Sequence, residues 1–293
     1  MTRALRHRSR QAYAEVIGDP IAQSKSPAIH GFWLGKLGIA ADYRACHVTA
    51  DGLADYLTAR RADPAWRGCN VTMPHKQAVI PLLDRVDPLA ARIGAVNTIV
   101  RGDDGRLTGY NTDAGGFLEP LRDRLAETHY FRMARIIGTG GAARAIIAAL
   151  VDQGFTLVVA GRDPAKARAL LDELAPTGEH HAVNLAHFAD PTDFPFDDRE
   201  GCLDLVVNAS ALGMAGQPPL AFDLSHAPPG SIAYDIVTAP LDTAFLRGAR
   251  AAGHRTVDGL AMLIGQAAAA FARFFDQTAP RAGDAELRKV LTR

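Results

Sequence analysis

The first part of the chain alternates short apolar runs with segments of helical periodicity. From Tyr13 onward the sequence predicts strands at AEVIG, DYRACHV and RGCNVT, and helices at AIHGFWLGKLG, GLADYLTARR and KQAVIPLLDRV. This alternation is typical of α/β layers built on a parallel sheet. AVNTIVRG and RLTGYN flank Asp103, Asp104 and Gly105, which predicts a hairpin at one edge of that sheet.

A second series of strands follows the predicted helix GGFLEPLRDRL. ARII, FTLVVAG, DLVVNAS and SIAYDIV are nearly continuous apolar runs, as expected for parallel strands that are buried on both faces. The change from one series to the other lies near Asp113. The last apolar segment, LAMLIGQAAAAFARFF, predicts a helix that needs a partner surface, and its periodicity fits either sheet. Residues 178–200 predict a loop.

Composition limits the classes of function. A chain of 293 residues with 48% hydrophobic and 22% charged residues is long enough for two soluble domains. Thirty-two basic residues balance thirty-two acidic ones, so no net charge favours nucleic acid or an anionic membrane. The basic opening, MTRALRHRSRQ, lacks the apolar core and cleavage site of a secretory signal, which predicts a loose tail, with a transit peptide as the alternative.

The three cysteines and the absence of a long apolar run suggest the compartment. Cys46, Cys69 and Cys202 are widely spaced and form no CxxC pair, so we expect reduced thiols and neither a disulfide framework nor a metal site. No apolar run approaches the roughly 18 residues of a membrane span. The sequence therefore predicts a cytoplasmic protein.

The stretch QSKSPAIH has the pattern of a helix start. Ser26 is a favourable N-cap and Pro27 suits the first helical position, because its missing N–H would be unpaired there anyway. A capping Ser26 would keep its own hydrogen to donate to a ligand. Ser24 is not required by the cap, so we expect both hydroxyls to face one ligand.

A glycine-rich stretch carries the dinucleotide pattern GxGxxG/A. GTGGAA, from Gly138 to Ala143, directly follows the strand ARII and opens the helix ARAIIAALVDQG. In this pattern Gly138 makes the tight turn, Gly140 lets the backbone approach a pyrophosphate, and Ala143 packs closely on the strand. The alternative is a structural turn without a ligand.

The residues after the next strand select the cofactor. An acidic residue there binds the ribose 2′-hydroxyl of NAD, whereas arginine can hold the 2′-phosphate of NADP. AGRDPAK places Arg162 at the strand end and Lys166 one helical turn later, which favours NADP(H), with NAD(H) as the alternative. Asp163 either caps the next helix or contacts a ribose. Arg162 could equally be a solvated surface residue.

Polar groups interrupt the apolar pattern in NVTMPHK, GAVNT and GYNTD, where strands end. Ligand contacts in α/β proteins gather at such positions. Lys76 falls in the first turn of its predicted helix, where a cation is mildly unfavourable and loses its proton slightly more easily. Asp113 either caps a helix or, if it lies beside Lys76, tunes the lysine for acid–base work. For Lys76 alone, a surface lysine is the ordinary alternative.

These stretches together resemble the shikimate dehydrogenase family. The matches lie between about residues 15 and 271 and are GDPIAQSKSPAIH, NVTMPHK, GAVNT, GYNTD, GTGGAARA, NASALGM, YDIVTAP and DGLAMLIGQAAAAF. The resemblance implies reversible reduction of 3-dehydroshikimate to shikimate with NADPH, in aromatic amino-acid biosynthesis. It also implies a substrate-binding α/β domain at 12–113, completed by 259–293, and a Rossmann-type dinucleotide-binding domain with a parallel sheet at 114–258.

The resemblance also assigns roles to individual residues. Lys76 and Asp113 match the catalytic pair, in which Lys76 exchanges the proton and Asp113 holds it. The substrate-binding matches are Ser24, Ser26, Thr72, Asn97, Tyr234 and Gln266. The cofactor-binding matches are Gly138, Gly140, Gly141, Ala142, Arg162, Lys166, Asn208, Ser210, Gly213, Met214 and Gly259. Taken singly, Asn97 could be a turn residue, Gln266 a polar position on a buried helix and Tyr234 a core strand residue.

Some positions depart from the family pattern. AGRD stands where NADP-dependent members usually have Asn-Arg-Thr, Tyr110 replaces a residue that is often acidic, and Thr238 replaces a common aromatic. The alternatives are therefore an NAD-preferring quinate/shikimate dehydrogenase or a low-activity paralogue. A shikimate- or quinate-sensing module is disfavoured by the retained catalytic pair, and a folate-type dehydrogenase by the SKSP and NTD stretches. We expect a monomer or homodimer.

Overall fold

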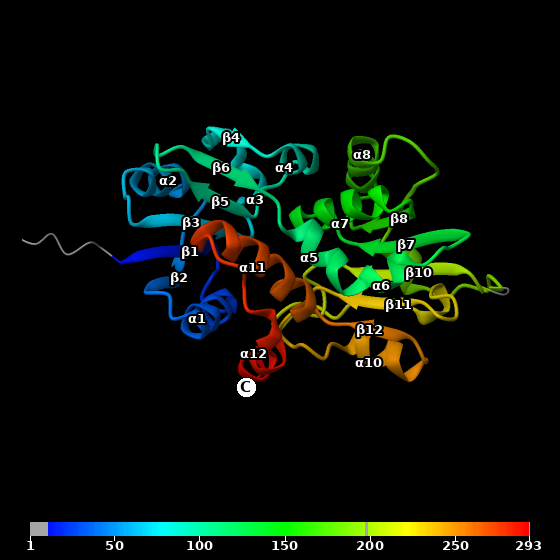
Figure 1. Cartoon of the computed structure of the whole chain (residues 1–293). Helices are drawn as coiled ribbons and strands as arrows, with labels where there is room; N and C mark the ends of the chain where they lie inside the picture. Colours follow the sequence, from blue (N-terminus) through cyan, green and yellow to red (C-terminus); the bar gives the residue numbers. More distant parts are fainter. Residues whose placement is uncertain (1–10, 197–198, 293) are drawn as a thin grey trace, which may run out of the picture. The chain divides into compact units, whose positions relative to one another are not determined.

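The computed structural model describes residues 11–196 and 199–292, which divide into two compact units (Figure 1). The first unit comprises Met1–Asp87, Val96–Tyr110 and Ala270–Arg293, and the second Pro88–Ala95 and Asn111–Ala269. The predicted loose tail lies almost wholly in residues 1–10, outside the described residues. The functional domains expected at 12–113 with 259–293 and at 114–258 stay a prediction.

The first unit is an α/β layer with a mixed sheet. Its helices and strands along the chain are β1 (Ala12–Gly18), α1 (Ser26–Leu37), β2 (Ala41–His47), α2 (Leu53–Arg61), β3 (Trp66–Val71), α3 (His75–Ala78), η1 (Ile80–Leu82), β4 (Arg85–Val86), β5 (Thr98–Arg101), β6 (Leu107–Tyr110), η4 (Arg281–Gly283) and α12 (Asp284–Leu291), where η marks a 3₁₀ turn. Within the described residues the strand order is β2-β1-β3-β5-β6-β4, with β1 parallel to β2 and β3. The β5–β6 hairpin is confirmed, but β4 pairs outside β6, so the predicted edge position is wrong.

The two faces of this sheet have different partners. Figure 1 shows α1 and α2 on opposite sides of the strands. On the α1 face, the ring of Tyr43 in β2 stacks on His30, with 3.9 Å between the ring centroids. On the α2 face, Tyr56 donates a hydrogen bond to the buried carboxylate of Glu15 in β1. Side chains alternate between faces along each strand, so neighbouring residues of one strand serve different layers.

The helix predicted over KQAVIPLLDRV is wrong in its extent. The helix α3 ends at Ala78, after which the chain forms the 3₁₀ turn η1 and the short strand β4. Pro81 explains the break, because proline has no N–H to donate to Gln77 and its ring clashes with that carbonyl in a helix.

The second unit contains the parallel sheet predicted from the apolar runs. Its helices and strands are α4 (Pro88–Ile93), α5 (Asp113–Leu118), η2 (Glu119–Leu121), α6 (Arg122–Ala126), β7 (Phe131–Ile137), α7 (Gly141–Asp152), β8 (Thr156–Gly161), α8 (Pro164–Leu174), β9 (His181–Asn184), α9 (Ala186–Ala189), β10 (Cys202–Asn208), η3 (Leu224–His226), β11 (Ile232–Asp235), α10 (Ala244–Ala251) and β12 (Arg255–Val257). The helix α11 (Gly259–Phe275) begins in this unit and ends in the first. β9 and α9 occupy the segment expected to be a loop.

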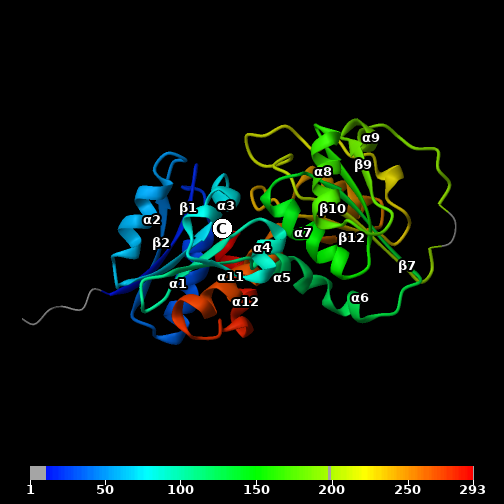
Figure 2. The same cartoon turned by 90° about the horizontal axis from the view of Figure 1, so that it is seen from above.

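Both faces of the second sheet are covered, which confirms the prediction that its strands are buried on both faces. The described strands run parallel in the order β12-β11-β10-β7-β8-β9. Ala134 and Ile136 of β7 face a cluster that includes residues of α5, α7 and α8, whereas Ile137 faces a cluster with α9 and α10. Figure 2 shows α7 alongside α8. This α/β fold places the carboxyl ends of β7, β8, β10 and β11 at one edge, where Rossmann-type folds bind their ligands.

Candidate active site

The glycine-rich loop between β7 and α7 has the geometry that a dinucleotide requires. Gly138 has φ 123°, and a Cβ there would lie 2.7 Å from the carbonyl oxygen of Ala209, so no other residue fits without displacing backbone. Gly140 caps α7 in an extended conformation, and a Cβ there would meet no atom within 4 Å. The space beside Gly140 is therefore open next to the N–H groups of Gly141 and Ala142, where a helix start favours a phosphate.

The structure decides between the two roles that the sequence left open for Asp163, which follows β8. The carboxylate of Asp163 accepts a hydrogen bond of 2.9 Å from the N–H of Ala165 and so caps α8. Arg162 and Lys166 are both exposed beside this cap. Two cations at the carboxyl end of β8, with the neighbouring carboxylate engaged in capping, fit a 2′-phosphate better than a free ribose hydroxyl.

The loop after β10 is held by its own polar side chains. Asn208 is fully buried and donates to the carbonyl of Leu212 and to the carboxylate of Asp235. Its Oδ1 accepts from both the N–H and the hydroxyl of Ser210. The two residues predicted to bind cofactor thus shape the loop that carries Gly213 and the half-buried Met214.

Asp235, at the end of β11, is a residue that the sequence analysis missed. It is completely buried and accepts hydrogen bonds from the hydroxyl of Thr243, the N–H of Val237 and the amide of Asn208. Burial raises its pKa, and these hydrogen bonds oppose the rise. Gly259 packs against the same loop, since a Cβ there would lie 2.3 Å from the carbonyl oxygen of Val237. Asp235 therefore joins the loops that follow β10 and β11.

The serine pair adopts a different arrangement from the predicted one. The N-cap of α1 is Lys25 and makes no side-chain cap bond, so Ser26 is not the N-cap. Instead, the hydroxyl oxygen of Ser24 accepts the N–H of Ser26 at 3.3 Å. Ser26 is buried. The side chain that accepts an N–H at this helix start is therefore that of Ser24, which still has its own hydrogen to donate.

Lys76 is positioned by backbone and side-chain anchors rather than by a long helix. It is the second residue of the four-residue α3, so the helix-dipole argument made from the sequence loses most of its basis. The carbonyl of Lys76 accepts the N–H of Val96 at 2.7 Å. The preceding His75 is buried and donates its Nε2–H to the carbonyl of Val48 at 2.6 Å. Both contacts fix the half-buried Lys76 within the first unit.

Asn97 and Thr72 also lie in the first unit. Asn97 is buried, and its Oδ1 accepts a hydrogen bond of 3.0 Å from the hydroxyl of Thr98. Thr72 is half-buried directly after β3, and its N–H donates to the carbonyl of Ile17. Both residues therefore stand at strand ends, as predicted.

Asp113, Gln266 and Tyr234 belong to the second unit. Asp113 is buried, but it is the first residue of α5 and not its N-cap, because Asn111 accepts the N–H groups of Asp113 and Ala114. The predicted capping alternative for Asp113 is thus wrong. The hydroxyl of Thr112 donates to Gln266 at 3.4 Å.

Tyr234 is fully buried in β11 and stacks on Phe117. Within the described part of the chain its hydroxyl has no hydrogen-bond partner. Burial raises the pKa of this phenol, so it stays protonated and able to donate.

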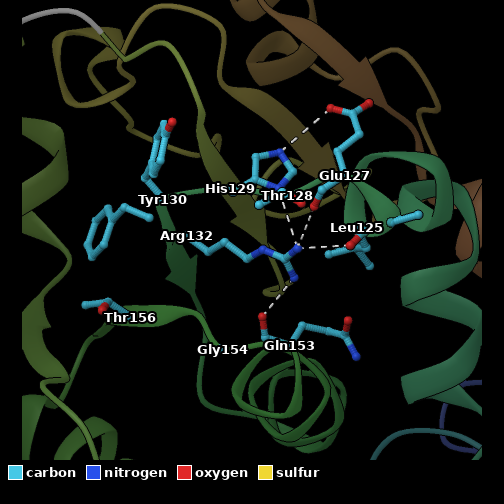
Figure 3. A pocket seen from close by; sticks show the side chains of 11 residues that line it. Leu125, Glu127, Thr128, His129, Tyr130, Arg132, Gln153, Gly154 and Thr156 are labelled. Atoms are coloured by element: carbon cyan, nitrogen blue, oxygen red, sulfur yellow. Dashed lines mark hydrogen bonds and ion pairs between the residues drawn. The ribbon is translucent and has the colours of Figure 1, made fainter.

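A hollow in the second unit lies away from the predicted residues. It is lined by residues 125–132, 153, 154 and 156, at the start of β7, whereas Gly138 follows its end. Figure 3 shows Arg132 directing its guanidinium toward backbone carbonyls, and it donates to those of Gln153, Leu125 and Glu127. Arg132 therefore ties together the ends of α6 and α7. In the ranges that the structure describes, no group of three or more His, Cys, Asp or Glu could hold a metal ion.

Comparison with known proteins identifies the family. The model of the shikimate dehydrogenase substrate binding domain matches residues 16–99, and that of the shikimate 5′-dehydrogenase C-terminal domain matches residues 259–284. A shikimate dehydrogenase (NADP(+)) of Sphingopyxis alaskensis is 51% identical over 280 residues, which cover 95% of this chain and 96% of the relative. The chain belongs to the shikimate dehydrogenase family.

Solved structures of family members share the fold. A shikimate 5-dehydrogenase from Thermus thermophilus, in complex with NADP(H) and shikimate, has a TM-score of 0.79 and 36% identity, covering 96% of this chain and 100% of that one. A quinate dehydrogenase from Corynebacterium glutamicum, in complex with NAD, has a TM-score of 0.80 and 32% identity, covering 96% and 99%. The predicted family and α/β fold are confirmed, and family membership argues against the folate-type alternative.

Proposed function

We propose that this chain catalyses the reversible NADPH-dependent reduction of 3-dehydroshikimate to shikimate. The observation that carries the proposal is the 51% identity, over nearly the full length of both chains, to a relative named shikimate dehydrogenase (NADP(+)). The relative's name agrees with the predicted activity and cofactor. The open space beside Gly140, with exposed Arg162 and Lys166 on the same unit, fits a dinucleotide that carries a 2′-phosphate.

Each predicted residue has a distinct task in the proposed reaction. NADPH, when bound, supplies the hydride that reduces the ring ketone. Lys76 supplies the proton and stabilises the developing alkoxide, and the carboxylate of Asp113 holds the lysine and keeps it charged. Ser24 donates its hydroxyl hydrogen to the substrate carboxylate. The motif positions within the family support the pairing of Lys76 with Asp113.

A four-way turnover assay tests the proposed function. Nicotinamide absorbance is followed with shikimate and with quinate, each with NADP⁺ and with NAD⁺. We expect the highest kcat/KM for shikimate with NADP⁺. Highest turnover of quinate with NAD⁺ would instead favour the quinate/shikimate alternative, for which the fold similarity to a quinate dehydrogenase in complex with NAD is the supporting observation. Absence of turnover in every combination would reject the enzyme and leave the sensing module.

Arg162→Ala tests the preference for NADP. Removing a guanidinium that holds a phosphate costs about 1.5 to 3 kcal/mol, so KM for NADP⁺ should rise at least tenfold while KM for NAD⁺ stays near its original value. The matched control is Arg168→Ala, which removes another exposed arginine of the same region, one that pairs with Asp172 on α8. Equal effects of Arg162→Ala on both cofactors would remove Arg162 from the phosphate site.

A cytoplasmic location and a monomeric or homodimeric state are parts of the proposal. None of the helices in residues 11–196 and 199–292 is long and apolar enough to cross a membrane.

A further inference from the structure

Buried polar side chains form a continuous row across the first sheet. Tyr43, Asn70 and Thr98 lie on the neighbouring strands β2, β3 and β5, and each is at most 5% exposed. In the strand register, Tyr43 is paired with Ala14, and Asn70 is paired both with Val16 and with Thr98. Side chains at paired positions share a face, so the row lies on the face that is covered by α1.

Hydrogen bonds join this row into one chain with a single direction. The phenol of Tyr43 donates to Oδ1 of Asn70 at 2.6 Å, and Nδ2 of Asn70 donates to the hydroxyl of Thr98 at 3.0 Å. The hydroxyl of Thr98 then donates to Oδ1 of Asn97 at 3.0 Å. The hydroxyls of Tyr43 and Thr98 each donate their one hydrogen in the same direction, toward Asn97.

This chain of hydrogen bonds ends at Asn97, which the family resemblance assigns to substrate binding. An amide side chain has two orientations that differ in which end donates. Because Thr98 donates to Oδ1 of Asn97, the oxygen of that amide faces Thr98. The amide nitrogen, which can only donate, therefore faces the other side. Asn70 also donates to the backbone carbonyl of Asn97 at 3.2 Å, which fixes the same residue a second time.

The surroundings keep the chain of hydrogen bonds in one protonation state. The ring of His30 stacks on Tyr43 with an interplanar angle of 1°, and burial lowers the pKa of His30 to about 3. Burial raises the pKa of Tyr43, so its phenol keeps the hydrogen that it donates to Asn70. A neutral imidazole and a neutral phenol therefore hold the same geometry across the pH range in which dehydrogenases are assayed.

We propose that Tyr43, Asn70 and Thr98 are positioning residues for the substrate, which set the orientation of the Asn97 side chain. The inference rests on the proposed function, since it takes Asn97 as a substrate contact. None of the three residues needs to touch shikimate. Their loss should weaken shikimate binding while leaving the cofactor affinity, which depends on the second unit, unchanged.

Tyr43→Phe tests the row at its first member. The substitution keeps the ring against His30 and removes only the hydroxyl, so Oδ1 of Asn70 loses its donor. We expect KM for shikimate, and the shikimate Kd measured by calorimetry, to rise about tenfold, with KM for NADP⁺ unchanged. The matched control is Tyr13→Phe, because Tyr13 is similarly buried in the same unit but donates to Asp63. A shikimate KM for Tyr43→Phe within twofold of the Tyr13→Phe value would overturn the inference.

Thr98→Val and Thr98→Ser separate the hydrogen bond from packing. Valine keeps the volume of threonine and removes the hydroxyl, whereas serine keeps the hydroxyl and removes a methyl group. We expect Thr98→Val to raise the shikimate KM about tenfold and Thr98→Ser to stay near the wild-type value. The reverse order, or equal values, would show that Thr98 acts only through packing and would overturn the role given to it.

Assays of the wild-type chain separate a failure of the positioning role from a failure of the proposed function. If the wild-type chain turns over shikimate and Tyr43→Phe leaves the shikimate KM unchanged, the positioning role alone is rejected. A wild-type chain that neither turns over nor binds shikimate would reject the proposed function, and the positioning role with it.

Discussion

Lys76→Ala is expected to lower kcat for shikimate oxidation by about 10² to 10⁴ and to leave shikimate binding nearly intact. The physical reason is that a general acid acts on a proton that moves only in the transition state, so its removal affects the barrier more than the affinity. The helix of Lys76 is held through the backbone of Lys76 and through His75, and the substitution keeps both contacts. Folding should therefore survive the substitution.

The measurement combines steady-state kinetics with direct binding. kcat is followed by nicotinamide absorbance, and the shikimate Kd by calorimetry. Lys36→Ala is the control, because Lys36 is an exposed lysine of the first unit and is paired with Glu286. Near-normal kcat in Lys76→Ala would refute the proton-transfer role. A large rise in Kd with unchanged kcat would instead make Lys76 a substrate-binding residue.

The features predicted best from sequence are those whose geometry is encoded locally. A glycine pattern between an apolar strand and a helix nearly determines the loop by itself, because Gly138 must adopt a positive φ and Gly140 must leave open space. The apolar runs predicted the strands of the second sheet just as directly. A strand that is buried on both faces is apolar at successive positions, so it does not alternate apolar with polar residues. The family resemblance then supplied residue roles that no local pattern could give.

The predictions that were wrong in detail involve neighbours that compete for one task. Ser26 is a residue type that favours the N-cap, but the N-cap is Lys25, and Ser24 accepts the N–H of Ser26. Asp113 likewise has the composition of a cap, but Asn111 accepts the N–H groups instead. Sequence names the candidates for such a bond, whereas the backbone geometry decides among them.

One error could have been avoided from the sequence. Pro81 stands in the middle of the predicted helix KQAVIPLLDRV, and a proline there ends a helix or kinks it. The row formed by Tyr43, Asn70 and Thr98 could not have been found in the same way. It depends on the pairing order and register of strands that lie far apart in the sequence, which tertiary structure alone provides.

Gly140→Val is expected to raise KM for NADP⁺ about 100-fold without unfolding the protein. Gly140 has a conformation that other residues adopt, with φ −86°, and a Cβ there meets no protein atom within 4 Å, so the folded chain accommodates a side chain. The same space is where a pyrophosphate would approach the N–H groups at the start of α7. A valine would displace it and weaken charge-assisted hydrogen bonds worth about 1.5 to 3 kcal/mol each.

Two further glycine variants make this expectation specific. Gly31→Val, in the exposed part of α1, also meets no atom within 4 Å and should leave KM for NADP⁺ and the melting temperature nearly unchanged. Gly138→Val should fail to fold properly, because its side chain would collide with Ala209 at a positive φ. A Gly140→Val variant with normal KM would place the pyrophosphate elsewhere. If Gly140→Val raises the KM for NADP⁺ and leaves the shikimate Kd and the melting temperature unchanged, the pyrophosphate lies against Gly140. Only the cofactor needs the space that the protein leaves empty there.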